Sequence, residues 1–259
     1  MSEQSTPSNP DRSAFLKPFW THTFGPPWRV SLLLLAVLEG VRYFAVFSPY
    51  PAQALFFLQY AATWAVPFIF LTSNGRFQIG LRERGASFRS LGLGALAGAA
   101  YALPVFVLGM VLYGDSPDNW CISLRDYMRL NELRGVMHPA AVFALFSVPA
   151  ILFAPIGDEI LFRGLIHQAF ERRWNRIAAT AVNCTAYGFT YLYFHAIWMD
   201  GSGIHFRLIS GLLSVVLLMG AGVVFTVCRL LCGSLWAAVA AHAAFNLTML
   251  GASIVYYMR

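Results

Sequence analysis

The sequence predicts an all-α, polytopic transmembrane helical bundle with about seven spans, within a range of six to eight. Two observations lead to this prediction. Of the 259 residues, 58% are hydrophobic and only 12% are charged, which is more apolar surface than one soluble domain of this length can bury. The apolar residues also fall in runs of roughly 20, the length that a helix needs to cross hydrocarbon about 30 Å thick.

The apolar runs divide the chain into its expected spans. Their approximate boundaries are 30–47, 52–72, 91–113, 140–170, 177–199, 208–230 and 234–257. The third run begins with the small residues LGLGALAGAA at 91–100. Small residues let helix backbones approach closely in lipid, so we expect this stretch to pack against another helix.

The N-terminal segment differs from the rest in composition. It is rich in Ser and Pro and has no apolar core of its own, which argues against a cleaved signal peptide. We therefore expect a cytoplasmic irregular tail at 1–29, followed by a single membrane-embedded helical domain at 30–259. With the tail inside, eleven Lys and Arg fall in inner segments and five in outer ones, as the positive-inside rule requires.

The charge distribution also restricts the partners. The net charge of +6 fits contact with the anionic headgroups of a lipid bilayer. The sequence has no basic stripe interleaved with aromatic residues, so we expect no nucleic-acid partner. The predicted localisation is an integral membrane protein of the bacterial inner (plasma) membrane with a cytoplasmic N-terminus.

The stretch GDEILFRG, at 157–164, places ionisable groups inside an apolar span. Such groups cost several kcal/mol in a membrane unless they face the protein interior or a cavity. Glu159 and Arg163 are four residues apart and can pair on one helix face, while Asp158 points elsewhere. Glu39 and Arg42, three apart in the first span, are expected to form a structural ion pair.

Two further polar pairs have the same four-residue spacing on other spans. They are Tyr191 with His195 in YLYFH and His242 with Asn246 in HAAFN. Convergence of these pairs with the first motif would satisfy all of them. A free carboxylate beside a neutral imidazole can deprotonate water, and a second His with an Asn can stabilise an oxyanion. The set predicts hydrolysis, with water rather than a Ser or Cys side chain as the nucleophile.

These motifs resemble a known family. DEILFR looks like its EExxxR motif, YLYFH like FxxxH, and HAAFN, within GSLWAAVAAHAAFN, like the final HxxxN. The family is that of the CAAX-processing and bacteriocin-processing membrane endopeptidases, also called the Abi or type II CAAX prenyl protease family. The resemblance covers about 140–250. Two positions depart from the usual pattern, because Asp158 stands where the family has Glu and Tyr191 where it has Phe.

The resemblance implies a glutamic-type intramembrane endopeptidase without a cofactor or metal. By position, Asp158 and His195 would activate water, Glu159 and Arg163 would shape the site, and His242 and Asn246 would hold the oxyanion. These six are the predicted catalytic residues, and Tyr191 is the predicted substrate-binding residue. The expected substrate is a membrane-anchored or membrane-associated peptide or protein, cut in or near its membrane segment.

Other function classes fit the same residues. One is a zinc-dependent membrane hydrolase with His195, His242 and one carboxylate as ligands, although the chain has no HExxH motif. Another is a non-catalytic membrane protein, either an immunity or scaffold protein or a proton-coupled transporter. The sequence does not select the substrate or the membrane face to which the site opens.

Overall fold

The computed structural model describes residues 14–48, 54–81, 87–127, 130–200 and 203–258. Almost all of this part is helical, and the all-α fold class predicted from the sequence is confirmed. In chain order the elements are α1 (Pro18–Phe24), α2 (Pro27–Phe47), α3 (Ala54–Phe70), α4 (Ser73–Gln78), α5 (Phe88–Tyr113), α6 (Trp120–Tyr127), α7 (Leu130–Leu133), α8 (Pro139–Ile151), α9 (Phe153–Asp158), the π-helix η2 (Glu159–Ile166), α10 (His167–Arg173), α11 (Arg176–Thr190), α12 (Leu192–His195), β1 (Ile197–Asp200), β2 (Gly203–Phe206), α13 (Leu208–Cys232) and α14 (Leu235–Tyr257).

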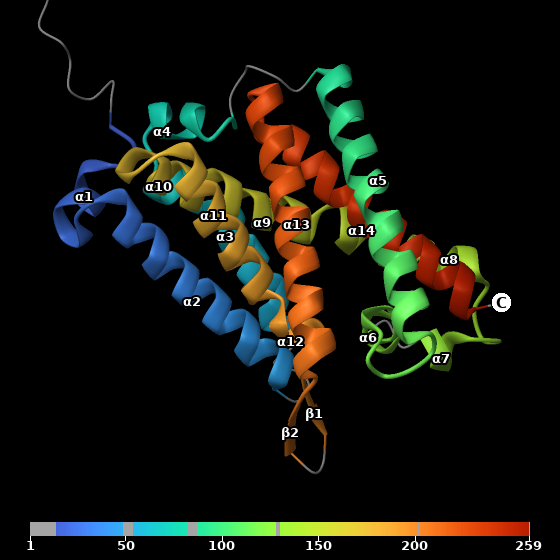
Figure 1. The fold of residues 1–259 in the computed structure, drawn as a ribbon. Coiled ribbons are helices and arrows are strands. Elements are labelled where there is room, and N and C mark those ends of the chain that lie inside the picture. Colours follow the sequence, from blue (N-terminus) through green and yellow to red (C-terminus); the bar gives the residue numbers. More distant parts are fainter. Residues whose placement is uncertain (1–13, 49–53, 82–86, 128–129, 201–202, 259) are drawn as a thin grey trace, which may run out of the picture.

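The described residues contain five helices long and apolar enough to cross a membrane, so the chain is an integral membrane protein. They are Pro27–Phe47, Phe88–Tyr113, Pro139–Arg173, Leu208–Cys232 and Leu235–Tyr257, and a shorter apolar helix, Phe57–Phe70, accompanies them. These six correspond to six of the seven predicted spans. Figure 1 shows the long helices crossing one another at the centre of the molecule.

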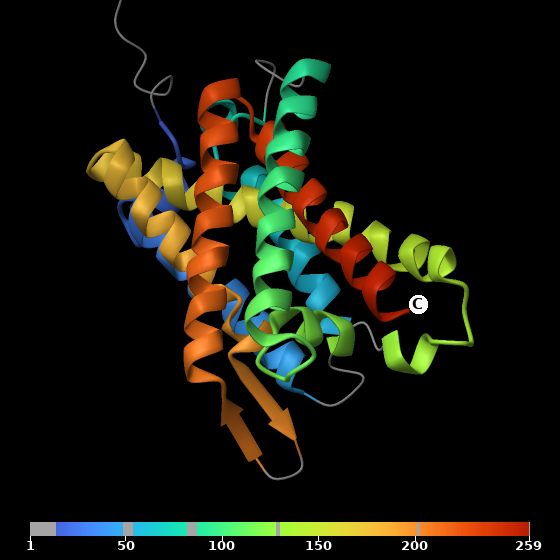
Figure 2. The ribbon, with the colours of Figure 1, turned by 45° about the vertical axis from the view of Figure 1, so that its right-hand side comes forward.

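The seventh predicted span, 177–199, differs from the structure. Its helix is interrupted at Tyr191, which has φ −93° and ψ 16°, and ends at His195. The chain then turns into an antiparallel hairpin in which Ile197 pairs with Phe206. The hairpin projects beyond the end of α13 (Figure 2). Its strands are only four residues long, too short to stand out in an otherwise apolar sequence.

The predicted tail is only partly described, since residues 1–13 lie outside the described ranges. The remainder includes α1, which was not expected in an irregular tail, and the first residues of α2. Leu16 forms an antiparallel bridge with Leu71, and both side chains are buried. This part of the segment therefore packs on the helical domain.

Among the described glycines, the closest approach to another helix is that of Gly98 on α5 to α14. The small-residue run at 91–100 predicted such close packing. A Cβ atom on Gly98 would lie 1.8 Å from the carbonyl oxygen of Ala241, and one on Gly94 would lie 2.3 Å from that of Ala237. Only glycine allows backbones to approach so closely. Because Ala241 precedes His242, this contact also fixes the position of the final motif.

The helix that carries the first motif is irregular. A break at Leu152 separates α8 from α9, and the π-helical stretch η2 begins directly after Asp158. Pro149 and Pro155 remove two backbone donors in this region. π-Helical turns are rare in proteins, and those that occur are often found at functional sites.

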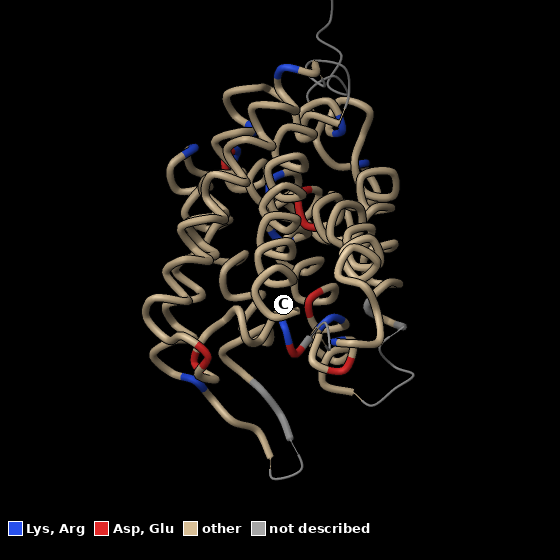
Figure 3. Tube along the Cα trace, turned by 90° about the vertical axis from the view of Figure 1, so that its right-hand side faces the viewer, with Lys and Arg blue, Asp and Glu red and all other residues tan. Residues whose placement is uncertain are grey.

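Figure 3 shows that the charged residues gather mostly near the ends of the bundle, with few in its middle.

Candidate active site

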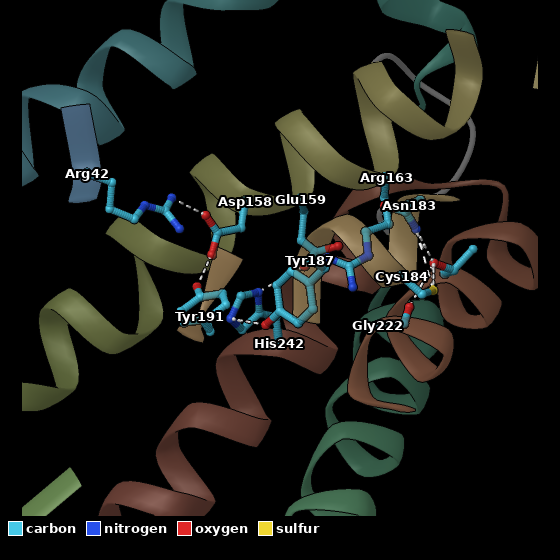
Figure 4. A network of polar contacts seen from close by, with 11 residues as sticks. Arg42, Asp158, Glu159, Arg163, Asn183, Cys184, Tyr187, Tyr191, Gly222 and His242 are labelled. Atoms are coloured by element: carbon cyan, nitrogen blue, oxygen red, sulfur yellow. Dashed lines mark hydrogen bonds and ion pairs between the residues drawn. The ribbon is translucent and has the colours of Figure 1, made fainter. Parts of the chain in front are cut away.

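Asp158 ends α9 and is fully buried. Its Oδ1 atom accepts a hydrogen bond from Nη2 of Arg42 at 2.6 Å, and Arg42 comes from α2. Its Oδ2 atom accepts a hydrogen bond from the hydroxyl of Tyr191. Both oxygens of this carboxylate therefore have partners, whereas the sequence predicted a free Asp158 (Figure 4).

Glu159 begins η2 and has a different environment. Its Oε1 atom accepts hydrogen bonds from Nη1 of Arg163 at 3.1 Å and from Nδ1 of His242 at 2.9 Å. The Arg163 pair is the one that the four-residue spacing predicted. The second oxygen, Oε2, is buried and has no hydrogen-bond partner among the described residues.

Arg163 is enclosed by aromatic rings and small groups. Its Cζ atom lies 4.2 Å from the ring centroid of Tyr187 and 5.1 Å from that of Phe225. A Cβ atom on Gly222 would lie 3.0 Å from its Nη2 atom, so α13 leaves little space for the guanidinium to move. Cation–π contacts in such desolvated surroundings hold the group in place.

His242 connects Glu159 to the interior of the bundle. Since a carboxylate only accepts hydrogen bonds, the Nδ1 atom that faces Glu159 carries the proton. Nε2 is then the acceptor, and the hydroxyl of Tyr187 lies 3.4 Å from it. The imidazole is stacked on Phe225 at a centroid distance of 4.9 Å. These contacts fix the ring with its basic nitrogen directed away from Glu159.

A cavity of about 320 Å³ lies beside His242. Its wall is mainly apolar and aromatic and includes three predicted site residues, Tyr191, His242 and Asn246. The Nδ2 atom of Asn246 donates a hydrogen bond to the carbonyl of Ala150 at 3.1 Å. An amide NH₂ group has two N–H donors, so the second can donate to a ligand. Clefts of this size with few polar groups are typical of ligand sites.

His195, the remaining predicted catalytic residue, lies in a separate group of polar side chains. Its Nδ1 atom is 2.7 Å from Oγ of Ser123 and its Nε2 atom is 3.1 Å from Oγ of Ser210. The hydroxyl of Ser210 donates in turn to Asp118 at 3.4 Å. The sequence placed His195 beside Asp158; within the described ranges, the structure gives both ring nitrogens of His195 hydroxyl partners instead.

Arg207 closes the same group at the base of the hairpin. Its Nη1 atom donates to the backbone carbonyl of His195 at 3.1 Å. Burial lowers the pKa of the Arg207 guanidinium below its usual value, and the negative charges of Asp118 and Asp126 offset only part of this shift.

Among the described residues, no three His, Cys, Asp or Glu side chains are grouped as a metal site would require.

Comparison with known families identifies the region that carries these residues. Residues 140–248 match the family model for the type II CAAX prenyl endopeptidase Rce1-like proteins. This segment is Rce1-like. The recognition made from the three motifs is thus confirmed, and the Rce1-like segment contains all seven predicted site residues. Its family implies CAAX intramembrane protease activity. No curated protein and no solved structure matched the chain.

Arg42 lies outside the Rce1-like segment and was not predicted as a site residue. The sequence correctly predicted its ion pair with Glu39, which has an Nε to Oε2 distance of 3.3 Å. Its contact with Asp158 joins positions 116 residues apart. A local spacing pattern cannot indicate such a contact. A buried arginine in an apolar span was the only available signal.

Proposed function

We propose that this protein is an intramembrane endopeptidase that hydrolyses a peptide bond in or near a membrane-associated segment. The observation that carries the proposal is the 2.9 Å contact between Glu159 and His242, inside the Rce1-like segment and at the wall of an apolar cavity. A carboxylate that orients an imidazole makes its other nitrogen a better proton acceptor, as in the Asp–His part of a catalytic triad.

In the proposed reaction, His242 is the general base and Glu159 stabilises its charged form. A water in the cavity gives one proton to Nε2 of His242, and its oxygen adds to the carbonyl carbon of the substrate. The resulting oxyanion accepts hydrogen bonds from the Tyr187 hydroxyl and from Asn246. The imidazolium then transfers its proton to the nitrogen of the leaving amine as the C–N bond breaks. No cofactor or metal takes part.

Asp158 and Arg163 support this reaction without contacting the substrate. Arg163 holds the Glu159 carboxylate through the same oxygen that faces His242, and Asp158 accepts a hydrogen bond from the hydroxyl of Tyr191. Tyr191 then presents its ring to the substrate, consistent with the substrate-binding role predicted from the sequence. This assignment exchanges the roles that the sequence suggested, because Asp158 paired with His195 was the expected water-activating set.

The cavity also favours a class of substrate. Its apolar and aromatic wall suits uncharged groups, such as the side chains of a peptide that enters from the membrane. We therefore propose a membrane-anchored or membrane-associated peptide or protein as the substrate. The excess of Lys and Arg in the segments assigned to the inner side favours a cytoplasmic N-terminus, and we propose a bacterial plasma membrane as the location.

Two variants test the assignment on a substrate found by comparing protein termini in membranes with and without the protein. Glu159→Gln should lower kcat by on the order of 10²–10⁴, the contribution of general-base catalysis, because His242 loses the carboxylate that stabilises its charged form. Asp158→Asn should keep most of its turnover per folded molecule. It should lose stability, because removing one partner of a buried ion pair costs about 3–5 kcal/mol.

The measurements are the cleavage rate and the thermal unfolding of the purified variants in detergent. An inactive Asp158→Asn with an active Glu159→Gln would reverse the two roles. Identical termini in membranes with and without the protein, together with no cleavage of any peptide by the wild type, would reject peptidase function.

A further inference from the structure

The two adjacent carboxylates each have a guanidinium of their own. Asp158 pairs with Arg42 at 2.6 Å, and Glu159 pairs with Arg163 at 3.1 Å. The side chains of all four residues are 0% exposed. Figure 4 shows Arg42 and Arg163 approaching the carboxylates from opposite directions.

The two arginines reduce the repulsion between the adjacent carboxylates. Two like charges on neighbouring residues in a low-dielectric interior repel each other. A separate cation for each carboxylate offsets this repulsion. Arg163 belongs to the same helical stretch as Glu159, but Arg42 belongs to α2, outside the matched residues 140–248.

Arg42 is itself fixed on several sides. Its Nε atom lies 3.3 Å from Oε2 of Glu39 on the same helix. Its Cζ atom lies 4.8 Å from the ring centroid of Tyr60 and 5.7 Å from that of Tyr191. Three carboxylates, Glu39, Asp158 and Glu159, thus share two guanidiniums, so loss of Arg42 would leave Arg163 as the only arginine of this cluster.

We propose that Arg42 is a positioning residue of the peptidase site. By neutralising Asp158, it prevents that carboxylate from competing with Glu159 for Arg163 and His242. This inference rests on the proposed function, and it adds α2 to a site that the Rce1-like segment alone does not complete. Arg42 acts on the reaction only through the charges and partners of the two carboxylates.

The test combines Arg42→Gln with Asp158→Asn. Arg42→Gln should lower kcat by about 10- to 100-fold, within the range of coupling in one hydrogen-bonded network, with little change in KM. Adding Asp158→Asn removes the carboxylate that has lost its partner, so the double variant should recover the kcat of Asp158→Asn alone. Arg42→Lys keeps the charge and should retain more activity than Arg42→Gln.

Arg229→Gln is the matched control, since Arg229 is also a buried arginine but bonds to Gln168 and His167. It should lose stability and keep its turnover per folded molecule. All rates are measured on a peptide that spans one cleavage site found in the comparison of membranes, and are corrected for the folded fraction. Recovery of kcat in the double variant supports the inference, because a merely structural arginine would not give it.

Three results would overturn the inference: wild-type kcat in Arg42→Gln, additive losses in the double variant, or an equal loss of kcat in Arg229→Gln. Where Arg42→Gln does not fold, the double variant decides, because the inference requires it to fold and to match Asp158→Asn. A wild type without any turnover would reject the proposed function and this inference together. An active wild type with additive losses would reject the inference alone.

Discussion

His242 and His195 are both buried histidines of the Rce1-like segment, but their surroundings differ. His242 has a carboxylate at one nitrogen, a tyrosine hydroxyl near the other, and an apolar cavity beside its ring. His195 has serine hydroxyls at both nitrogens. Both histidines are equally buried, so the proposed roles, His242 as the base and His195 as a hydrogen-bonding group, rest on the partners of each imidazole.

The largest expected effect comes from substituting each histidine by glutamine. His242→Gln should lower kcat by on the order of 10²–10⁴ through loss of the general base. His195→Gln should instead lower the free energy of unfolding by about 1–2 kcal/mol, because up to two hydrogen bonds are lost. Its turnover per folded molecule should stay close to that of the wild type.

Cleavage assays and chemical unfolding of the two purified variants make this measurement. The assignment of the two histidines is contradicted if folded His195→Gln is inactive and His242→Gln remains active. In that case the pairing of Asp158 with His195, which the sequence motifs suggested, is the correct assignment.

An intermediate effect is expected from glycines that pack next to each histidine. A Cβ atom on Gly98 would lie 1.8 Å from the carbonyl oxygen of Ala241, and one on Gly211 would lie 2.5 Å from Cβ of Ala196. Each Gly→Ala change should therefore destabilise the protein by about 1–3 kcal/mol through overpacking. Only Gly98→Ala should also lower the turnover per folded molecule, because it displaces the backbone that carries His242.

Gly92→Ala is the control for these changes, since nothing lies within 4 Å of a Cβ atom at that position of α5. Its stability should stay the same or rise by up to about 1 kcal/mol, the difference between Ala and Gly in a helix. Equal losses of turnover in Gly98→Ala and Gly211→Ala would show that both histidine regions serve the reaction.

The smallest expected effect is that of chelation, which should leave turnover unchanged. The proposed chemistry uses the Glu159–His242 pair to activate water and needs no Lewis acid. The measurement is the cleavage rate after exhaustive chelation, together with metal analysis of the active protein. Stoichiometric zinc whose removal abolishes turnover would mean that His195 and His242 approach one another in the active protein, and the two regions would be one site.

The sequence predicted those parts of the site that depend on local spacing. The pairs Glu159–Arg163 and Glu39–Arg42 follow from the helical period and both occur in the structure. Partners far apart in the chain could not be predicted in this way. The contact of His195 with Ser123 spans 72 residues, and it depends on α6, a helix that lies outside all seven predicted spans.

The fold, like the site, was predictable from the sequence only in part. Span positions were predictable because each apolar run must match the thickness of the membrane. The helix break at Tyr191 and the hairpin after His195 were not, since four-residue strands carry almost no periodic signal. The contact of Asp158 with Arg42 of α2, from which we propose to exchange the roles of Asp158 and Glu159, was also beyond the sequence.

The π-helix η2 gives the Pro139–Arg173 segment two helical phases. A π-turn holds one more residue per hydrogen-bonded ring than an α-turn, so the helix after Ile166 is rotated relative to the helix before Glu159. This rotation lets one continuous segment bury Asp158 against Arg42 and His167 against Arg229. A regular α-helix with the same number of residues would turn His167 to a different face, so it could keep only one of these two contacts in register.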